Sequence, residues 1–191
     1  FDEIILTTTN REISVQVKLP KNENIDIESE GWCVVPGKYF IDIAKKIEGK
    51  NIEFTLFEEN TIKILSERSN FTLIALEKNN FPQINFAPLG TPIVLKASVL
   101  KQIIRQTAFA AGSSESRITL TGVCLELAEN RLKAIATDSY RLAKKETELD
   151  YNLENTRVNV PSKALEELNK ILTDDTEDVK MYIMVNKILF I

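Results

Sequence analysis

The sequence predicts an α+β protein that contains two copies of one domain, each with helices packed on antiparallel sheets. The first observation is a repeat: the Val-Pro-x-Lys start and the amphipathic pattern of residues 35–47 recur in residues 160–172, 125 positions further along. The second observation is the strand-like alternation that follows both segments. A repeat of this length is typical of a duplicated domain, because solenoid units span only about 20–50 residues.

A shorter echo precedes each repeated segment. Asn10-Arg11 comes before the alternating residues 13–17, and Asn130-Arg131 comes before the alternating residues 132–136. Polar pairs of this kind are typical of turns between strands. We therefore expect these two pairs to be equivalent turns in the two copies.

In the first copy, period-two alternation and short apolar runs predict a series of strands. They cover residues 3–9, 12–19, 32–35, 51–57, 61–66 and 70–77. A helix is expected over residues 36–48, because Pro36 suits the first turn and Gly49 suits a C-cap. Its apolar side chains are spaced i, i+3, i+4, i+7 from Phe40, which predicts one buried face.

Residues 79–92 contain three prolines and Gly90, and they are expected to link domains at residues 1–88 and 89–191. The second copy is expected to hold helices over residues 96–111 and 161–172. Its expected strands are residues 93–95, 118–127, 131–137, 141–149, 178–184 and 187–191, with a Glu129-Asn130 turn between the second and third. The first copy lacks the earlier helix, and the chain begins at Phe1 and ends in an apolar run. We therefore expect a fragment in which both copies are truncated.

Composition excludes most catalytic chemistry. The chain has no histidine, which removes the commonest general base and most zinc and iron sites, and its six glycines form no phosphate-binding motif. The Glu58-Glu59 and Asp174-Asp175 pairs are expected to be solvated loop charges, and Cys33 and Cys124 to be free core thiols. We predict no enzyme activity, no metal site and no cofactor. No apolar run reaches the length of a membrane span, so no membrane contact is expected.

Several longer segments resemble one family. Residues 136–143 read Ala-Thr-Asp-Ser-Tyr-Arg-Leu-Ala, residues 104–110 read Ile-Arg-Gln-Thr-Ala-Phe-Ala, and residues 80–82 read Asn-Phe-Pro. Together with Arg117 and the Leu-Thr-Gly-Val of residues 120–123, they resemble the bacterial β sliding clamps, the processivity subunits of DNA polymerase III. The resemblance covers nearly the whole chain and implies the DNA-clamp fold.

What the resemblance implies about function is specific. It implies a cytoplasmic, non-enzymatic protein that, at full length, forms a homodimeric ring around duplex DNA without sequence preference and tethers the replicative polymerase. The implied partners are the DNA polymerase III alpha subunit, the clamp loader and other proteins with a clamp-binding motif. Their short peptides would dock in a cleft between the second domain and a third domain beyond residue 191.

A ring that slides needs contacts to phosphate rather than to base edges. We expect helical cations and one loop to make them: Lys38, Lys45, Lys46, Lys101, Arg105, Ser113, Ser114, Arg117, Lys163 and Lys170. The net charge is −4, and the carboxylates concentrate away from the predicted helices, in residues 21–30, 53–59, 146–154 and 174–178. This predicts an acidic outer surface and a cationic inner one. The alternative is that these lysines are merely solvated helix faces.

By motif, the peptide cleft maps onto Leu120, Thr137, Ser139, Tyr140, Arg141 and Leu142. Tyr140 stands where family members often have histidine, and Leu120 and Leu142 could instead be core residues. Two other functions stay open. One is a protein-binding scaffold whose helices have no DNA role, and the other is a hydrolase that uses paired carboxylates, which the lack of histidine disfavours. The DNA-tethering function requires that the helical cations share one surface.

Overall fold

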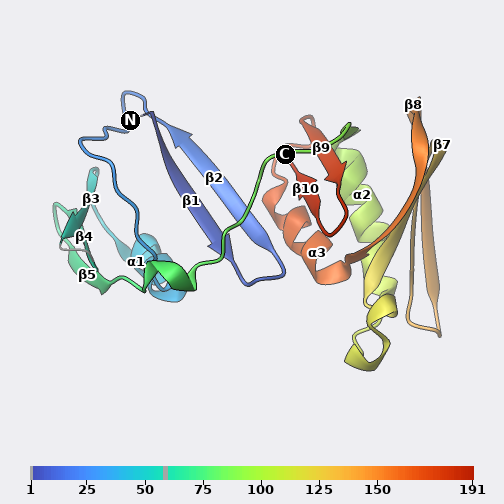
Figure 1. Cartoon of the computed structure of the whole chain (residues 1–191), viewed down its shortest axis with the longest axis horizontal. Coiled ribbons are helices and arrows are strands. Elements are labelled where there is room, and N and C mark those ends of the chain that lie inside the picture. The colour runs from blue at the N-terminus through green and yellow to red at the C-terminus, as the bar shows by residue number, and fades with distance from the viewer. Residues whose placement is uncertain (1, 58–59) are drawn as a thin grey trace. The chain divides into compact units, whose positions relative to one another are not determined.

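The computed structural model describes residues 2–57 and 60–191, apart from the side chains of Glu115, Asn152 and Leu153. The chain divides into two compact units, Phe1–Asn85 (unit 1) and Phe86–Ile191 (unit 2) (Figure 1). Residues 82–92 hold no helix or strand, and the expected domain boundary after residue 88 falls in this segment. The Glu58-Glu59 pair lies outside the described residues.

Unit 1 combines one α-helix with antiparallel strands in two sheets. Its elements are β1 (Glu3–Thr9), β2 (Ser14–Pro20), α1 (Gly37–Lys46), β3 (Ile52–Phe57), β4 (Thr61–Ser66), β5 (Asn70–Ile74) and the 3₁₀ turn η1 (Lys78–Asn80). β1 pairs with β2, and the second sheet has the order β3-β4-β5. The core is small: Ile62 and Ile64 on β4 are buried, whereas α1 has no fully buried residue.

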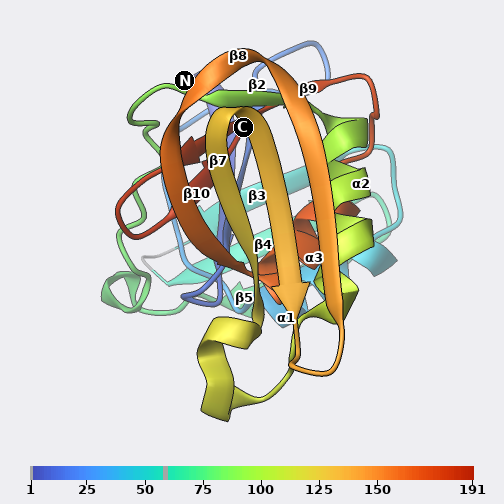
Figure 2. The ribbon, with the colours of Figure 1, turned by 90° about the vertical axis from the view of Figure 1, so that its right-hand side faces the viewer.

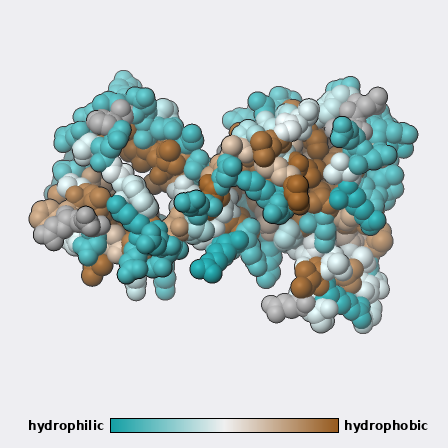
Figure 3. Space-filling model, viewed as in Figure 1, coloured by the Kyte–Doolittle hydropathy of each residue, from teal (hydrophilic) through white to brown (hydrophobic). Residues whose placement is uncertain are grey.

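The apolar stripe of α1 faces the second sheet of unit 1. The rings of Phe40 and Phe54 lie 6.1 Å apart, and the helix and sheet enclose a cavity of about 70 Å³. Figure 3 shows apolar patches on the surfaces of both units. On β3, Ile52, Phe54 and Phe57 are all exposed.

Unit 2 has two helices and two sheets. Its elements are β6 (Ile93–Lys96), α2 (Ala97–Thr107), η2 (Ala108–Ala110), η3 (Glu115–Leu120), β7 (Gly122–Thr137), β8 (Leu142–Pro161), α3 (Ser162–Ile171), β9 (Asp178–Ile183) and β10 (Ile188–Phe190). β7 and β8 form a long antiparallel ribbon, and the other sheet has the order β10-β9-β6. The hydroxyl of Tyr151 on β8 accepts from Val94 N at 2.6 Å and donates to Val94 O at 3.3 Å, which ties the ribbon to β6.

The two helices of unit 2 lie side by side against the β7–β8 ribbon (Figure 1). Ile103 on α2 and Leu165 on α3 are 1% and 2% exposed, and Val99 and Leu168 are partly buried against the same core. These four apolar residues therefore face the interior of unit 2. Leu132 and Ala134 on β7 supply the opposite side of the core. No helix in the described ranges is long and apolar enough to span a membrane.

Some predicted boundaries in unit 1 are wrong. Residues 32–35 form no strand, because their pairing is limited to a single bridge between Val34 and Leu76. The helix expected over residues 36–48 ends at Lys46, since Ile47 takes an extended conformation that turns its side chain into the cavity under α1. Gly49 is therefore not the C-cap; its φ of 140° belongs to the turn that follows.

The larger corrections concern unit 2. The expected Glu129-Asn130 turn is present as a bend within β7, which turns back on itself there with Glu129 at a φ of 54° (Figure 2), and its two halves pair with different parts of β8. The strand expected over residues 141–149 extends to Pro161, which gives β7 a partner along its whole length. Residues 118–120 belong to a 3₁₀ turn rather than to a strand, and α2 ends at Thr107, before a 3₁₀ turn.

Replacing Gly122 with alanine should destabilise unit 2. A Cβ at this position would lie 2.5 Å from Asn159 Oδ1 and 2.8 Å from the carbonyl oxygen of Val160, so β7 and β8 would have to separate where Gly122 pairs with Pro161. We expect the free energy of unfolding to fall by about 1–3 kcal/mol, as for other overpacked sites. Chemical denaturation checks this, with Gly112→Ala as the control because its Cβ would meet no atom nearer than 3.5 Å. Equal stability of the two variants would contradict the close approach.

Candidate nucleic-acid interface and peptide-binding turn

The cations of α2 and α3 lie on the sides of these helices that face away from the core. Lys101 and Arg105 are one turn apart on α2, and Lys163 and Lys170 are two turns apart on α3. The opposite faces carry the buried Ile103 and Leu165. Because α2 and α3 are neighbours, the four cations belong to one region of unit 2.

A shallow polar pocket of about 270 Å³ lies along the exposed side of α2. It is lined by Ser98, Lys101, Gln102, Arg105, Gln106 and Asp175. Lys101 Nζ lies 2.6 Å from Asp175 Oδ1, and the Lys101 side chain is only 14% exposed. Asp175 is 62% exposed, as expected for a solvated loop charge, and it also pairs with Lys101 because the loop after α3 returns to the start of α2.

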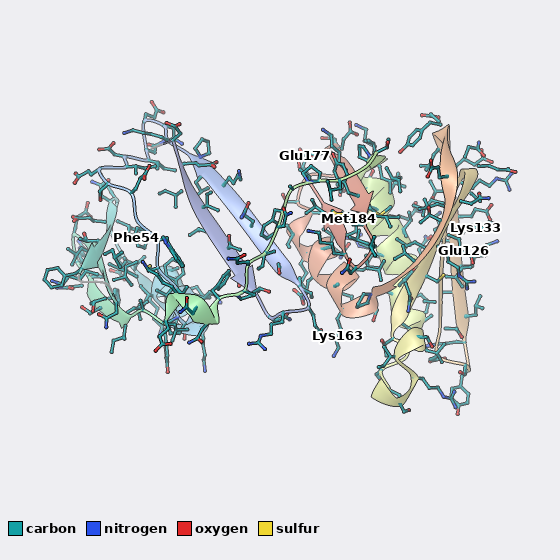
Figure 4. The ribbon with its side chains drawn as sticks, viewed as in Figure 1. Phe54, Glu126, Lys133, Lys163, Glu177 and Met184 are labelled. Carbon is teal, nitrogen blue, oxygen red and sulfur yellow. The ribbon has the colours of Figure 1, made fainter. Side chains whose placement is uncertain are left out.

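The exposed face of α3 is nearly neutral. Lys170 Nζ donates to Glu167 Oε1 at 2.7 Å, and this hydrogen bond and the carboxylate charge raise the pKa of Lys170. The side chain of Lys163 points away from the body of unit 2 (Figure 4) and has no ion pair among the described residues. Within unit 2, Arg105 and Lys163 are therefore the helical cations not already matched by a carboxylate.

Other expected DNA contacts lie on separate elements. Lys38, Lys45 and Lys46 are exposed on α1 of unit 1 together with Asp42. Ser113 and Ser114 are exposed in the loop after α2, where Ser114 Oγ and Ser116 Oγ share a hydrogen bond of 2.8 Å.

The outer face of the β7–β8 ribbon carries both signs of charge. Glu126 and Lys133 extend from β7 on this side (Figure 4). Glu126 pairs with Arg157 at 3.3 Å, and Glu146 pairs with Lys144 at 3.0 Å and Arg131 at 3.3 Å. Of the carboxylates in residues 146–154, Glu146 and Glu148 thus lie beside Arg131 of the neighbouring strand, at 3.3 Å and 3.9 Å.

The turn between β7 and β8 is held by short side chains. Asp138 Oδ1 accepts from the backbone N–H groups of Tyr140 and Arg141, both at 3.0 Å. Thr137 Oγ1 accepts from Ser139 N at 3.1 Å and donates to Arg141 O at 2.6 Å. This arrangement holds Ser139 at a φ of 82°, which a residue other than glycine seldom adopts. The turn therefore presents the next side chains outward.

Those side chains form an exposed cluster with apolar and cationic members. Tyr140 is 97% exposed and Leu142 67% exposed, so Leu142 is not a core residue, whereas Leu120 is half-buried. Arg141 Nε donates to Asp138 Oδ2 at 2.9 Å, and its guanidinium lies 5.7 Å from the ring centre of Phe109. All six residues predicted for the peptide cleft thus lie at one end of the β7–β8 ribbon and in the 3₁₀ turn beside it.

Three neighbouring residues were not predicted as part of this cluster. Arg117, expected to reach DNA, instead donates from Nη1 to Ser139 Oγ at 3.1 Å. Phe109 and Ile118 are 57% and 74% exposed. Their sequence gave no signal, because an apolar residue just after an amphipathic helix or just before a strand has the pattern of a core residue.

The same turn occurs in unit 1 between β1 and β2. Asn10 Oδ1 accepts from Glu12 N at 2.9 Å and Ile13 N at 2.7 Å, Thr9 Oγ1 accepts from Arg11 N at 3.0 Å, and Arg11 has a φ of 77°. The counterpart of Asn10-Arg11 is therefore Asp138-Ser139. The expected match with Asn130-Arg131 is wrong, because the hydrogen bonds of the Asn10 turn recur at Asp138.

The described part of the chain shows no cluster of side chains that would bind a metal ion. Cys33 and Cys124 are partly buried free thiols. Among the described residues, no three carboxylate or thiol side chains gather as a metal site.

Comparison with known proteins gives a consistent result across the chain. Residues 1–85 match the family model for the N-terminal domain of the DNA polymerase III beta subunit, and residues 94–191 match the model for its central domain. The beta sliding clamps of Staphylococcus epidermidis and Staphylococcus aureus are each 39% identical to this chain over 99% and 98% of its length. The chain spans about half the length of these relatives, 51% in both cases.

Solved structures agree in fold. The DNA polymerase III beta chain of Streptococcus pneumoniae superposes with a TM-score of 0.92 at 34% identity, over 99% of this chain and 51% of that one. The DNA polymerase sliding clamp of Bacillus subtilis gives a TM-score of 0.92 at 32% identity, with the same coverage of 99% and 51%.

The turn at Asp138 should loosen in acid. The backbone N–H groups of Tyr140 and Arg141, and then the Arg141 side chain, hold the pKa of Asp138 below its ordinary value. A lowered folded-state pKa means that the carboxylate stabilises the turn above about pH 4, its unfolded value, and that this contribution is lost as the pH falls through the lower folded value. We expect the Asp138 carboxyl carbon and the Tyr140 and Arg141 amides to titrate together by NMR. A midpoint at or above the ordinary Asp value would refute this account.

Proposed function

This chain belongs to the family of bacterial DNA polymerase III beta subunits, and we propose from this premise that it forms part of a sliding clamp. In this proposal the full-length subunit is a homodimer that closes around duplex DNA and tethers the replicative polymerase in the cytoplasm. It is not an enzyme: its parts bind DNA and peptides without chemistry. The two units would supply the N-terminal and central domains of the subunit.

The observation that carries the DNA role is the placement of cations on α2 and α3. Apolar packing fixes one face of each helix inward, so Arg105 and Lys163 face solvent from adjacent helices. Cations on an exposed helix face are suited to contacts with DNA phosphates. Such contacts carry no sequence information. Such contacts suit a protein that must hold DNA and still move along it.

Eight expected contacts lie outside this pair, and two of them, Lys101 and Lys170, are already paired with carboxylates. Lys38, Lys45 and Lys46 are exposed and would contact phosphate from unit 1, and Ser113 and Ser114 would do so from the loop after α2. Arg117 is better placed at the turn, because it already donates to Ser139.

We further propose that the turn at residues 137–142 binds the peptides of clients. Tyr140 and Leu142 offer apolar surface, and Arg141 is fixed between Asp138 and Phe109 where it can bind a peptide carbonyl or carboxylate. The alpha subunit of the polymerase, the clamp loader and other proteins with the clamp-binding motif are the proposed clients. A protein-binding scaffold without a DNA role would use the same turn, so only the helices separate the two functions.

Neutralising Arg105 and Lys163 together should shorten retention on DNA. We expect about tenfold faster loss of the full-length subunit from nicked circular plasmid at moderate salt, because each lost phosphate contact lowers the salt slope by about 0.9. The matched control is Arg131→Gln with Lys133→Gln, which removes the same charge from the outer face of β7. If both pairs of substitutions shorten retention equally, net charge rather than the helix face is responsible.

Tyr140→Ala and Arg141→Ala should each weaken client binding by about 1–2 kcal/mol if these residues are interface anchors. Isothermal titration of a clamp-binding peptide into the full-length subunit measures this, with Glu148→Ala on the outer ribbon face as the control. DNA retention should stay unchanged, because the turn and the helical cations are separate sites. Full affinity in both variants would exclude the turn as the docking site.

A further inference from the structure

Asp175, in the loop after α3, pairs with Lys101 on the exposed side of α2. Its carboxylate lies 2.6 Å from Lys101 Nζ and is itself 62% exposed, while Lys101 is 14% exposed. Both side chains line the polar pocket that also contains Arg105. The lysine is therefore covered and neutralised by a group of its own chain that remains open to solvent.

The backbone holds Asp175 in this position. Ser98 N donates to Asp175 O at 3.2 Å and Ala97 N donates to Glu177 O at 2.9 Å, so the loop after α3 caps the first turn of α2. Asp174 fixes the loop from the other side, because its Oδ1 accepts from Thr176 N at 2.8 Å and Thr176 Oγ1 at 2.6 Å. The loop thus presents the Asp175 carboxylate to Lys101 before any ligand arrives, and the backbone caps do not depend on the Asp175 side chain.

The charges around the two helices nearly cancel. Lys101, Arg105, Lys163 and Lys170 face three carboxylates, Glu166, Glu167 and Asp175, so one positive charge is in excess. A phosphate that approached Arg105 would meet Asp175 within the same pocket. The phosphate and the Asp175 carboxylate are both negative and repel each other, and the repulsion is strongest at low ionic strength.

We infer that Asp175 is a built-in counter-ion that competes with DNA phosphates for Lys101 and thereby limits how tightly unit 2 holds duplex DNA. The inference rests on the proposed function, since it concerns the strength of the same DNA contact. A phosphate must displace the carboxylate before it can use Lys101 and Arg105 together. The contact then stays weak, as a sliding contact requires.

The test is a double-mutant cycle on this chain with a short fluorescent duplex, read by anisotropy at several salt concentrations. Asp175→Asn should tighten binding about threefold or more at low salt and make the slope of log K against log salt steeper by about 0.9, the value for one added phosphate contact. In a Lys101→Gln background the same substitution should have a much smaller effect. Asp175→Glu, which keeps the charge, should bind like the parent.

Asp174→Asn is the matched control. It removes the same charge from the adjacent residue of the same loop, yet its Oδ1 can still accept from Thr176 and it does not touch Lys101. Thermal unfolding of each variant checks that the loop and α2 stay folded. NMR of lysine ammonium groups reports the Lys101 pair directly, and its signal should change with Asp175→Asn and not with Asp174→Asn.

The outcomes separate the inference from the proposed function. The counter-ion role of Asp175 would be overturned if Asp174→Asn and Asp175→Asn tightened duplex binding equally. It would also be overturned if Asp175→Asn tightened binding as much in the Lys101→Gln background. An unchanged Asp175→Asn variant in a chain whose duplex binding is still weakened by Arg105→Gln would overturn it as well. If neither Arg105→Gln nor Lys163→Gln weakens duplex binding, the proposed DNA contact itself fails.

Discussion

Burial of one face of α2 and one face of α3 against the β7–β8 ribbon is the constraint on which unit 2 depends. Removing a leucine or isoleucine side chain from water contributes about 1.5–3 kcal/mol, whereas an exposed ion pair contributes about 0–1 kcal/mol. The buried Leu100, Ile103, Ile104 and Leu165 therefore decide how each helix is rotated. Arg105 and Lys163 face outward as a consequence, and the cationic surface is a by-product of core packing.

The turn that precedes β8 is governed by local rather than tertiary forces. Thr137 and Asp138 satisfy the backbone of the next three residues with their own oxygens, and Thr9 and Asn10 do the same in unit 1. The backbone device is thus shared by both copies, while the side chains it presents differ. Tyr140 and Arg141 stand where unit 1 has Glu12 and Ile13, so the candidate peptide site belongs to unit 2 because of two side chains and not because of a special backbone.

Several carboxylates of unit 2 lie beside a cationic side chain and do not form a separate acidic surface. The ribbon places Glu126 beside Arg157 and Glu146 beside Arg131, and the loop after α3 places Asp175 beside Lys101. Composition shows an excess of acidic residues, but it cannot show that many of them already have a cationic partner. The electrostatic character of a face of this protein follows from cross-strand register and loop return, both of which join residues far apart in sequence.

The sequence by itself determined the α+β class, the duplicated helix after Pro36 and Pro161, the inward face of α1 and the turn motif at residues 137–142. These are local signals: period, capping and short side chains that hydrogen-bond to nearby backbone. Tertiary structure alone decided that β8 runs from Leu142 to Pro161, because only a strand of that length offers a partner to both halves of β7. It also decided that Asp175 covers Lys101 and that Phe109 supports Arg141, since these contacts join residues that no short sequence window contains.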